Sequence, residues 1–277
     1  MASTTETTQP IYDTDQKRSE ALHELLQAWK YRDLIYQLVY RDVTARYKRS
    51  VLGIAWTMLN PLGTMLILSV VFSQVFSSIE GYAAYVLSGL VVWNFFAQST
   101  AAGMNSLVWG GDLFRRIYLP RTVFAISAVL TGIVNLCLSL VPLGLVMLVV
   151  GVRIQPTVFL VVFPILLVAM FALGISLLLS SVGIFFPDVV EMYQIAIQAW
   201  FYLTPVVYKL DILPDAAQFW VRLNPMVYFV DLFRLPTFYG QVFSLKILGV
   251  SAAVALVTLL TGWLVFVQVS EELAYRA

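Results

Sequence analysis

Charged side chains are scarce in this chain of 277 residues: they make up 12% of it, against about 25% in an average soluble domain. Hydrophobic residues make up 60%, and the mean hydropathy is +0.83. A chain so poor in charge cannot cover a water-soluble core with polar surface. A soluble globular domain is therefore excluded.

The missing charges leave six long stretches without a charged side chain. Five exceed the ~20 residues that a helix needs to cross a bilayer, and Met192–Tyr208 is near the minimum. A membrane β-barrel would show alternating segments of ~10 residues, whereas these stretches are continuous. The sequence therefore predicts an all-α integral membrane protein with six transmembrane helices within residues 50–277. The stretches are Ser50–Ile79, Gly81–Gly111, Thr122–Val152, Ile154–Pro187, Met192–Tyr208 and Ile247–Ser270.

Residue types that support catalysis, metal binding or ion coupling are also rare. Cys137 has no second cysteine to pair with, and His23 lacks the second histidine of an HExxH zinc motif. No Gly-Lys dipeptide occurs, so the chain has no GxxxxGK[ST] phosphate loop. None of the six stretches holds the carboxylate, lysine or histidine that ion-coupled carriers bury in the membrane. We therefore expect no catalytic residue, metal site or cofactor here, and any ATP and magnesium on a separate ATPase subunit.

The 17 lysine and arginine residues are distributed unevenly. Eight precede Ser50, three lie within Asp112–Arg121, one is Arg276, and five occupy the remaining loops. The positive-inside rule then places both termini in the cytoplasm. The first 20 residues contain no hydrophobic segment of a cleavable signal peptide. The expected location is the plasma membrane, with multiple spans.

The residues before the first stretch divide into two parts. Residues 1–19 are polar and threonine-rich, which predicts a flexible N-terminus. Residues 20–49 are predicted to form a cytoplasmic amphipathic interface helix, with Leu34, Ile35 and Leu38 on one face and basic residues mostly elsewhere. Such a helix either anchors the chain at the lipid headgroups or docks another protein, and both readings stay open.

The loop Trp109–Pro120 reads WGGDLFRRIYLP. Two glycines, an aspartate suited to a helix N-cap and a basic segment before Pro120 predict a helix of one or two turns on the cytoplasmic side. It is either a docking element for another protein or an ordinary basic loop.

The segment after the fifth stretch, Tyr208–Leu245, is unlike a simple loop. Its prolines leave room for two short helices, Asp215–Leu223 and Met226–Leu235. Residues 200–243 hold 12 aromatic side chains, about twice their share by length. We therefore expect the two helices, at about residues 211–236, to re-enter the membrane on its outer side.

Two kinds of uncharged residue within the stretches predict helix packing. Small residues at a four-residue spacing, such as Ser99/Gly103, Ser176/Ser180 and Gly249/Ala253, allow helices to approach closely. Most of the amide residues are expected to form hydrogen bonds between helices, although amides beside aromatic rings also suit a path for a hydroxyl-rich substrate. These amides are Asn60, Gln74, Asn94, Gln98, Asn105, Asn135, Gln194 and Gln198.

Four segments in order resemble the permease subunits of ABC-2 type exporters, especially those for O-antigen, capsular polysaccharide and teichoic acid. They are RDVTARYKRSVLGIAWTMLNP (Arg41–Pro61), LFRRIYLPRTVFAIS (Leu113–Ser127), Phe185–Tyr208 and LNPMVYFVDLFR (Leu223–Arg234). One position departs from the family: Pro187–Asp188 stands where a basic-acidic pair is common, which puts an ionic contact with the ATPase at that turn in doubt.

The resemblance implies a homodimer in the bacterial inner membrane, bound to two copies of an ABC ATPase. Its other partners would be a lipid-linked polysaccharide and membrane lipids, with no nucleic acid. Coupling to the ATPase is expected at Arg41, Arg46, Lys48, Arg49, Gly111, Asp112, Leu113, Phe114, Arg115 and Arg116. Aromatic residues of the channel and its outer gate are expected to be Phe201, Tyr202, Tyr208, Phe219, Trp220, Tyr228 and Phe229.

The resulting hypothesis is the permease of an ATP-driven exporter that moves a lipid-linked polysaccharide outward through a channel between two permease copies. Two alternatives remain: an ABC-2 permease for a drug or small lipid, and a membrane scaffold subunit without transport activity.

Overall fold

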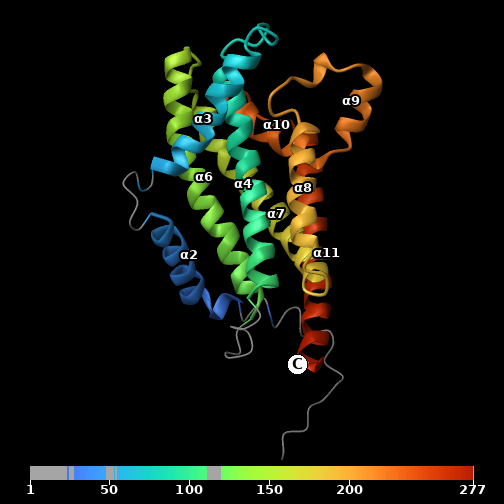
Figure 1. The fold of residues 1–277 in the computed structure, drawn as a ribbon. Helices are drawn as coiled ribbons and strands as arrows, with labels where there is room; N and C mark the ends of the chain where they lie inside the picture. Colours follow the sequence, from blue (N-terminus) through green and yellow to red (C-terminus); the bar gives the residue numbers. More distant parts are fainter. Residues whose placement is uncertain (1–23, 25–27, 48–52, 54, 111–119, 277) are drawn as a thin grey trace, which may run out of the picture.

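The computed structural model describes residues 24, 28–47, 53, 55–110 and 120–276, with the backbone alone for residues 46, 47 and 270–276. Within this part of the chain every regular element is helical (Figure 1). The elements are α2 (Arg32–Tyr47), α3 (Ala55–Phe72), α4 (Tyr82–Val108), α6 (Thr122–Val150), η1 (Pro156–Val161), α7 (Val162–Gly183), α8 (Val189–Tyr202), η2 (Leu210–Ile212), α9 (Asp215–Arg222), α10 (Pro225–Thr237) and α11 (Leu245–Arg276).

Four helical segments of the described chain are long and apolar enough to cross a membrane: α3, α6, η1 with α7, and the first 25 residues of α11. The sequence predicted six. Helix α4, with 27 residues, has sufficient length but carries several polar side chains, among them Asn94 and Gln98. Helix α8 has only 14 residues, or about 21 Å at 1.5 Å per residue. An all-helical membrane fold is therefore confirmed, and a topology of six spans is not.

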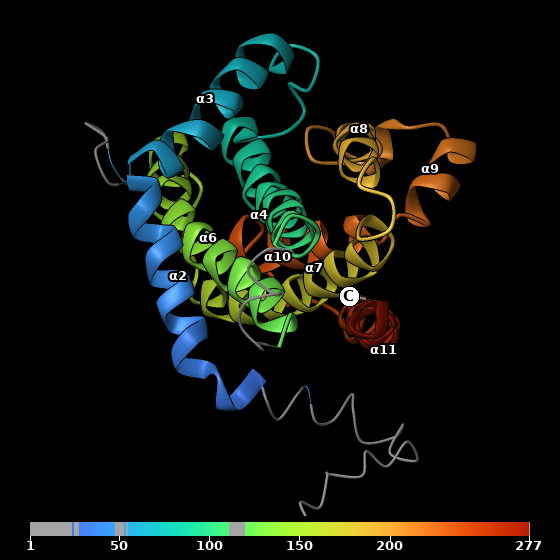
Figure 2. The ribbon, with the colours of Figure 1, turned by 60° about the horizontal axis from the view of Figure 1, so that its bottom comes forward.

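Helix α4 lies at the centre of the bundle, in contact with α3, α6, α7, α8 and α10 (Figure 2). Most of its residues are buried, including Leu87, Phe96 and Met104. The Phe96 ring stacks on Phe171 of α7, with the ring centres 5.3 Å apart. Since lipid tails are as apolar as these side chains, helix association here depends on close packing. The polar content of α4 is compatible with this protected position.

Small residues create the closest helix contacts, although not all at the predicted positions. A side chain at Gly103 would overlap Ser176, as the spacing of small residues predicted. Gly249, by contrast, faces open space, so its predicted packing role is wrong. The close approach of α7 and α11 occurs instead at Gly174 and Gly262, where an added Cβ on either glycine would clash with the backbone of the other helix.

Helix α2 packs along the bundle with one face and leaves the other exposed (Figure 1). Ile35 and Leu38 are buried in a second cluster with residues of α4, α6, α7 and α11, including Phe124 and Phe266. Three aromatic side chains in or just before α2 are exposed: Trp29, Tyr36 and Tyr40. The helix is therefore part of the folded bundle through its apolar face.

Candidate functional site

The two short helices predicted after the fifth stretch are present. Helix α9 begins at Asp215 and α10 at Pro225, and the second continues through Pro236 to Thr237 because a proline near the end of a helix leaves most of its hydrogen bonds intact. Figure 1 shows α10 beside the first half of α4, while α9 projects away from the bundle.

Arg234 fixes α10 to the rest of the fold. Its side chain is 1% exposed. Nη1 donates to the carbonyl of Pro205 (2.6 Å) and to the Tyr85 hydroxyl (2.9 Å), and Nη2 donates to the carbonyls of Tyr85 (3.2 Å) and Val206. Nε donates to Ser88 Oγ at 3.3 Å.

These five bonds match the five N–H groups of a guanidinium. The cation also lies over the Tyr85 ring, 3.7 Å from its centre, an arrangement that adds cation–π attraction. Arg234 thereby joins α10, α4 and the turn after α8. The sequence did not indicate a structural role for Arg234, since the segment LFRLP does not show which carbonyls lie opposite the guanidinium.

Two further residues make this junction possible. A Cβ at Gly89 would overlap Arg234 Nη2, so the guanidinium occupies the space that a side chain would fill. Asn224 caps α10 by accepting from the Met226 amide at 3.0 Å. The same Asn224 oxygen accepts from Trp200 Nε1 at 2.8 Å, and its nitrogen donates to Thr204 Oγ1 at 2.8 Å. The end of α8 and the start of α10 are thus held by one side chain.

Three of the seven aromatic residues proposed for the channel or gate are exposed at the surface of this chain, and three more are partly buried. Tyr202, Phe219 and Trp220 are 75%, 62% and 70% exposed. Phe201 is partly buried, with its ring 5.5 Å from that of Trp93. The Tyr208 and Tyr228 hydroxyls donate to the carbonyls of Tyr202 and Arg222.

Phe229 differs from the other aromatic residues of the set. It is fully buried, and its ring stacks on Phe171 with centres 4.9 Å apart. A side chain enclosed in this way packs the core and does not line a surface. We therefore remove Phe229 from the set of channel and gate residues.

Most of the residues expected to couple to an ATPase lie outside the described residues. These are Lys48, Arg49, Gly111, Asp112, Leu113, Phe114, Arg115 and Arg116, and of Arg46 only the backbone is described. Arg41 is exposed, and its Nη2 lies 2.8 Å from Asp42 Oδ1. An exposed ion pair of this kind contributes little to stability, about 0–1 kcal/mol.

The carboxyl of Glu24, which precedes α2, has a large pKa shift. Burial raises its pKa to about 7, while the positive charge of Arg121, at the start of α6, lowers it. The carboxyl therefore exchanges its proton near neutral pH, at the end of the bundle where α6 begins.

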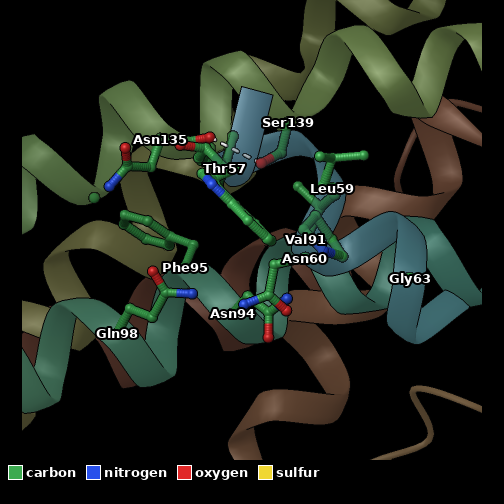
Figure 3. Close-up of a pocket in the computed structure, with 14 residues that line it drawn as sticks. Thr57, Leu59, Asn60, Gly63, Val91, Asn94, Phe95, Gln98, Asn135 and Ser139 are labelled. Carbon is green, nitrogen blue, oxygen red and sulfur yellow. Dashed lines mark hydrogen bonds between the residues drawn. The ribbon is translucent and has the colours of Figure 1, made fainter. Parts of the chain in front are cut away.

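A cavity of about 400 Å³ lies between α3, α4 and α6. Figure 3 shows Asn94 and Gln98 on the α4 wall and Asn135 on the α6 wall, with the Phe95 ring between Gln98 and Asn135. Ser139 Oγ donates to the backbone carbonyl of Asn135 at 2.9 Å. The rest of the lining is Trp56, Thr57, Leu59, Asn60, Pro61, Gly63, Val91, Gly132 and Leu136.

This cavity brings together four of the eight amides found in the sequence, from three helices. The side chains of Asn60, Asn94 and Gln98 make no hydrogen bond within the described part of the chain; Asn60 contributes only its backbone carbonyl, which accepts from Thr64 Oγ1 at 3.1 Å. The same holds for the side chains of Gln74, Asn105, Gln194 and Gln198 within the described residues. The prediction that most of the amides bond between helices is therefore wrong.

Four membrane-spanning helices, packed with a central polar-containing helix, define the class of this molecule: a multi-pass membrane protein. More specifically, the chain belongs to the ABC-2 type transporter family, whose family model matches residues 33–238. That range runs from the start of α2 to the residue after α10, so it includes the Arg234 junction and the amide-lined cavity.

The most informative similarities are to O-antigen export permeases. The chain is 32% identical to the O-antigen export system permease protein RfbA of Myxococcus xanthus over 194 residues, which cover 68% of this chain and 73% of that protein. Two RfbA proteins of Klebsiella pneumoniae are 28% and 30% identical over 187 and 188 residues. Each of these two alignments covers 66% of this chain and 71% of the relative.

Proposed function

We propose that this protein is the membrane permease subunit of an ATP-driven exporter that moves a lipid-linked polysaccharide of the O-antigen type from the cytoplasm outward. The observation that carries the proposal is its similarity to RfbA permeases, of which it aligns with more than 70%. Among the glycans suggested by the sequence, the relatives favour O-antigen over capsule and teichoic acid.

In this proposal α4 and α8 complete six spans, and both termini face the cytoplasm. Helix α4 is long enough and free of charge, and α8 continues into an apolar turn at residues 203–207. The α9–α10 unit then lies on the outer side and re-enters the membrane as a gate. The exposed rings of Tyr202, Phe219 and Trp220 suit stacking against sugar rings.

The translocation path lies between two copies of the permease, and two copies of a separate ABC ATPase bind at the cytoplasmic face. Helix α2 and the loop at residues 111–116 make that contact. ATP and magnesium belong to the ATPase, since the sequence of this chain has no GxxxxGK[ST] phosphate loop.

The test is reconstitution of the permease in lipid vesicles, with an ABC ATPase from the same organism and a lipid-linked O-antigen as substrate. Glycan that becomes accessible to a lectin on the opposite side only when ATP is hydrolysed supports the proposal. Transport without the ATPase, or with one whose Walker lysine is replaced, contradicts the coupling. Transport of a drug or a small lipid in place of glycan would favour the alternative permease function, and no transport would favour a scaffold.

A further inference from the structure

The amides of the cavity between α3, α4 and α6 need partners from outside this chain. A carboxamide offers two donors and an acceptor with two lone pairs, and the side chains of Asn60, Asn94 and Gln98 use none of them within the described residues. An unsatisfied polar group in hydrocarbon costs several kcal/mol, roughly 2–7. Asn94 is half-buried and Asn60 and Gln98 are exposed in this chain, so water or a polar ligand can reach all three of these groups at the cavity.

The lining also restricts the charge of that ligand. Among the residues that the structure describes, the lining contains amides, hydroxyls and apolar groups, and no aspartate, glutamate, lysine, arginine or histidine. A phosphate or a carboxylate would find no cation there, and a cation would find no carboxylate. Hydroxyl groups fit, because each one donates and accepts a hydrogen bond as the amides do.

Aromatic surface lies next to the amides. The Phe95 ring is placed between Gln98 and Asn135 (Figure 3), and the Trp56 side chain, 57% exposed, lies at the α3 wall. Pockets that combine apolar walls with a few convergent polar groups are typical of small-ligand sites. A sugar ring presents C–H groups to aromatic surface and hydroxyls to amides.

The position of the cavity argues against a lipid headgroup. Asn94 lies near the middle of the 27-residue α4, and Asn135 near the middle of the 29-residue α6. Headgroups lie at the ends of spanning helices, whereas the middle of such a helix is at the depth of the acyl chains. A second copy of the chain does not explain the cavity either. If a helix of that copy covered this face, its surface would leave the hollow of about 400 Å³ unfilled.

We propose that this cavity is a hydrated binding site for an uncharged, hydroxyl-rich ligand, namely a neutral sugar unit of the transported glycan. The proposal rests on the proposed function for the identity of the ligand. Asn60, Asn94, Gln98 and Asn135 bond to hydroxyls, and the Trp56 ring, which is 57% exposed, packs against the sugar ring. The site provides hydrogen-bond partners for the glycan at a depth where the lipid acyl chains provide none.

Thiol labelling tests whether the cavity contains water. Asn94→Cys and Gln98→Cys are made in a Cys137→Ser background, because Cys137 is exposed, and are treated with a charged methanethiosulfonate reagent in native membranes. Leu145→Cys, on an exposed part of α6 outside the cavity, is the control. Only the thiolate reacts, and a thiol in contact with water ionises more readily than one in apolar surroundings. The two cavity positions should therefore label at least about tenfold faster than position 145. Labelling as slow as at position 145 overturns the proposal.

The ligand is tested in the same membranes, prepared from cells that make the lipid-linked glycan and from cells that lack its biosynthesis. Glycan should slow labelling at positions 94 and 98, while position 145 is unaffected. Labelling that is equally fast in both preparations contradicts a glycan site and leaves a water-filled cavity only.

Export by leucine variants gives an independent measurement. Asn94→Leu and Gln98→Leu should each lower the export rate by about tenfold, which corresponds to the loss of about one hydrogen bond. Asn105→Leu, an amide of the same helix outside the cavity, should export normally. Normal export by all three variants contradicts the site. Failure of the unmodified permease to export any glycan contradicts instead the proposed function, and the labelling still reports whether the cavity is wet.

Discussion

At the residue scale, Arg234 shows how one buried cation can be stable in an apolar protein. Removal of an arginine from water is costly unless its donors are satisfied, and here all five N–H groups have acceptors. Three of those acceptors are backbone carbonyls, which do not depend on the protonation of another side chain. The charge therefore serves to hold three segments of backbone together.

Replacement of Arg234 by methionine should strongly destabilise the protein. The carbonyls of Pro205, Val206 and Tyr85 would lose their donor, and each buried unsatisfied group costs about 1–3 kcal/mol. We expect the unfolding temperature in detergent, measured by tryptophan fluorescence, to fall clearly. Arg222→Met is the matched control, because Arg222 is exposed on α9 and its side chain bonds to the Gln218 side chain. Equal unfolding temperatures for the two variants would show that the junction contributes no stability.

Glu24 should make stability depend on pH. Its folded pKa of about 7 lies above the ordinary value of 4.5, so between these values the folded chain keeps a proton that the unfolded chain has lost. Stability from this group is therefore greatest below about pH 4.5 and decreases as the pH rises to about 7. Glu24→Gln should flatten that part of the curve of unfolding temperature against pH. Glu191→Gln, an exposed site on α8, should leave it unchanged; an equal effect of both variants would argue against Glu24.

At the scale of elements, the sequence predicted where helices form better than it predicted which helices contact one another. The prolines predicted α9 and α10, because a proline limits where a helix can begin and continue. Helix packing depends on which residues of two distant segments meet, and a four-residue spacing occurs at many places. That is why Gly103 was predicted correctly, Gly249 wrongly, and the Gly174–Gly262 contact not at all.

The contact between α7 and α11 gives a prediction with an internal control. Gly262→Ala should destabilise the protein by about 1–3 kcal/mol, since a methyl group would overlap the Gly174 carbonyl and force the helices apart. Gly249→Ala, on the same helix with open space around it, should be neutral or stabilising by up to ~1 kcal/mol, because alanine favours a helix. Chemical denaturation in mild detergent measures both. A Gly262→Ala variant as stable as Gly249→Ala would contradict the close packing.

The aromatic side chains of the α9 region should affect transport more than folding. Trp220→Ala removes a ring that is 70% exposed, so little stability depends on it. We expect slower glycan export by Trp220→Ala and by Tyr208→Ala, with unchanged binding of the ATPase in a pull-down. Unchanged export would assign these rings to ordinary surface or packing roles.

At the scale of the whole molecule, the sequence predicted the membrane class because charge-free stretches are a property of composition alone. It also predicted the ABC-2 family, from four short segments in the correct order, and the family match over residues 33–238 confirms that prediction. It did not predict the amide-lined cavity, because Asn60, Asn94 and Asn135 become neighbours only when α3, α4 and α6 pack together. Nor did it predict Arg234 as a structural centre, since the carbonyls that bind it lie up to 149 positions away.

Coupling between the permease and its ATPase should depend on residues 112–116. Replacement of Asp112–Arg116 by glycine and serine should leave membrane insertion intact and allow ATP hydrolysis to continue without glycan export. The measurement compares ATP turnover with glycan delivered to the cell surface. A second variant, with glycine and serine in place of Gln241–Ser244 before α11, controls for a loop change elsewhere. Normal export by the 112–116 variant would remove this loop from the coupling site.

The lack of a Cβ at Gly89, which leaves space for the Arg234 guanidinium, has a consequence for the evolution of the chain. A homologue with alanine or a larger residue at position 89 has no space for an arginine at position 234 in this arrangement. A homologue without the arginine no longer needs glycine at position 89, although it must satisfy the carbonyls of Pro205 and Val206 in another way. The two positions, 145 residues apart, are therefore expected to change together across descendants of a common ancestor.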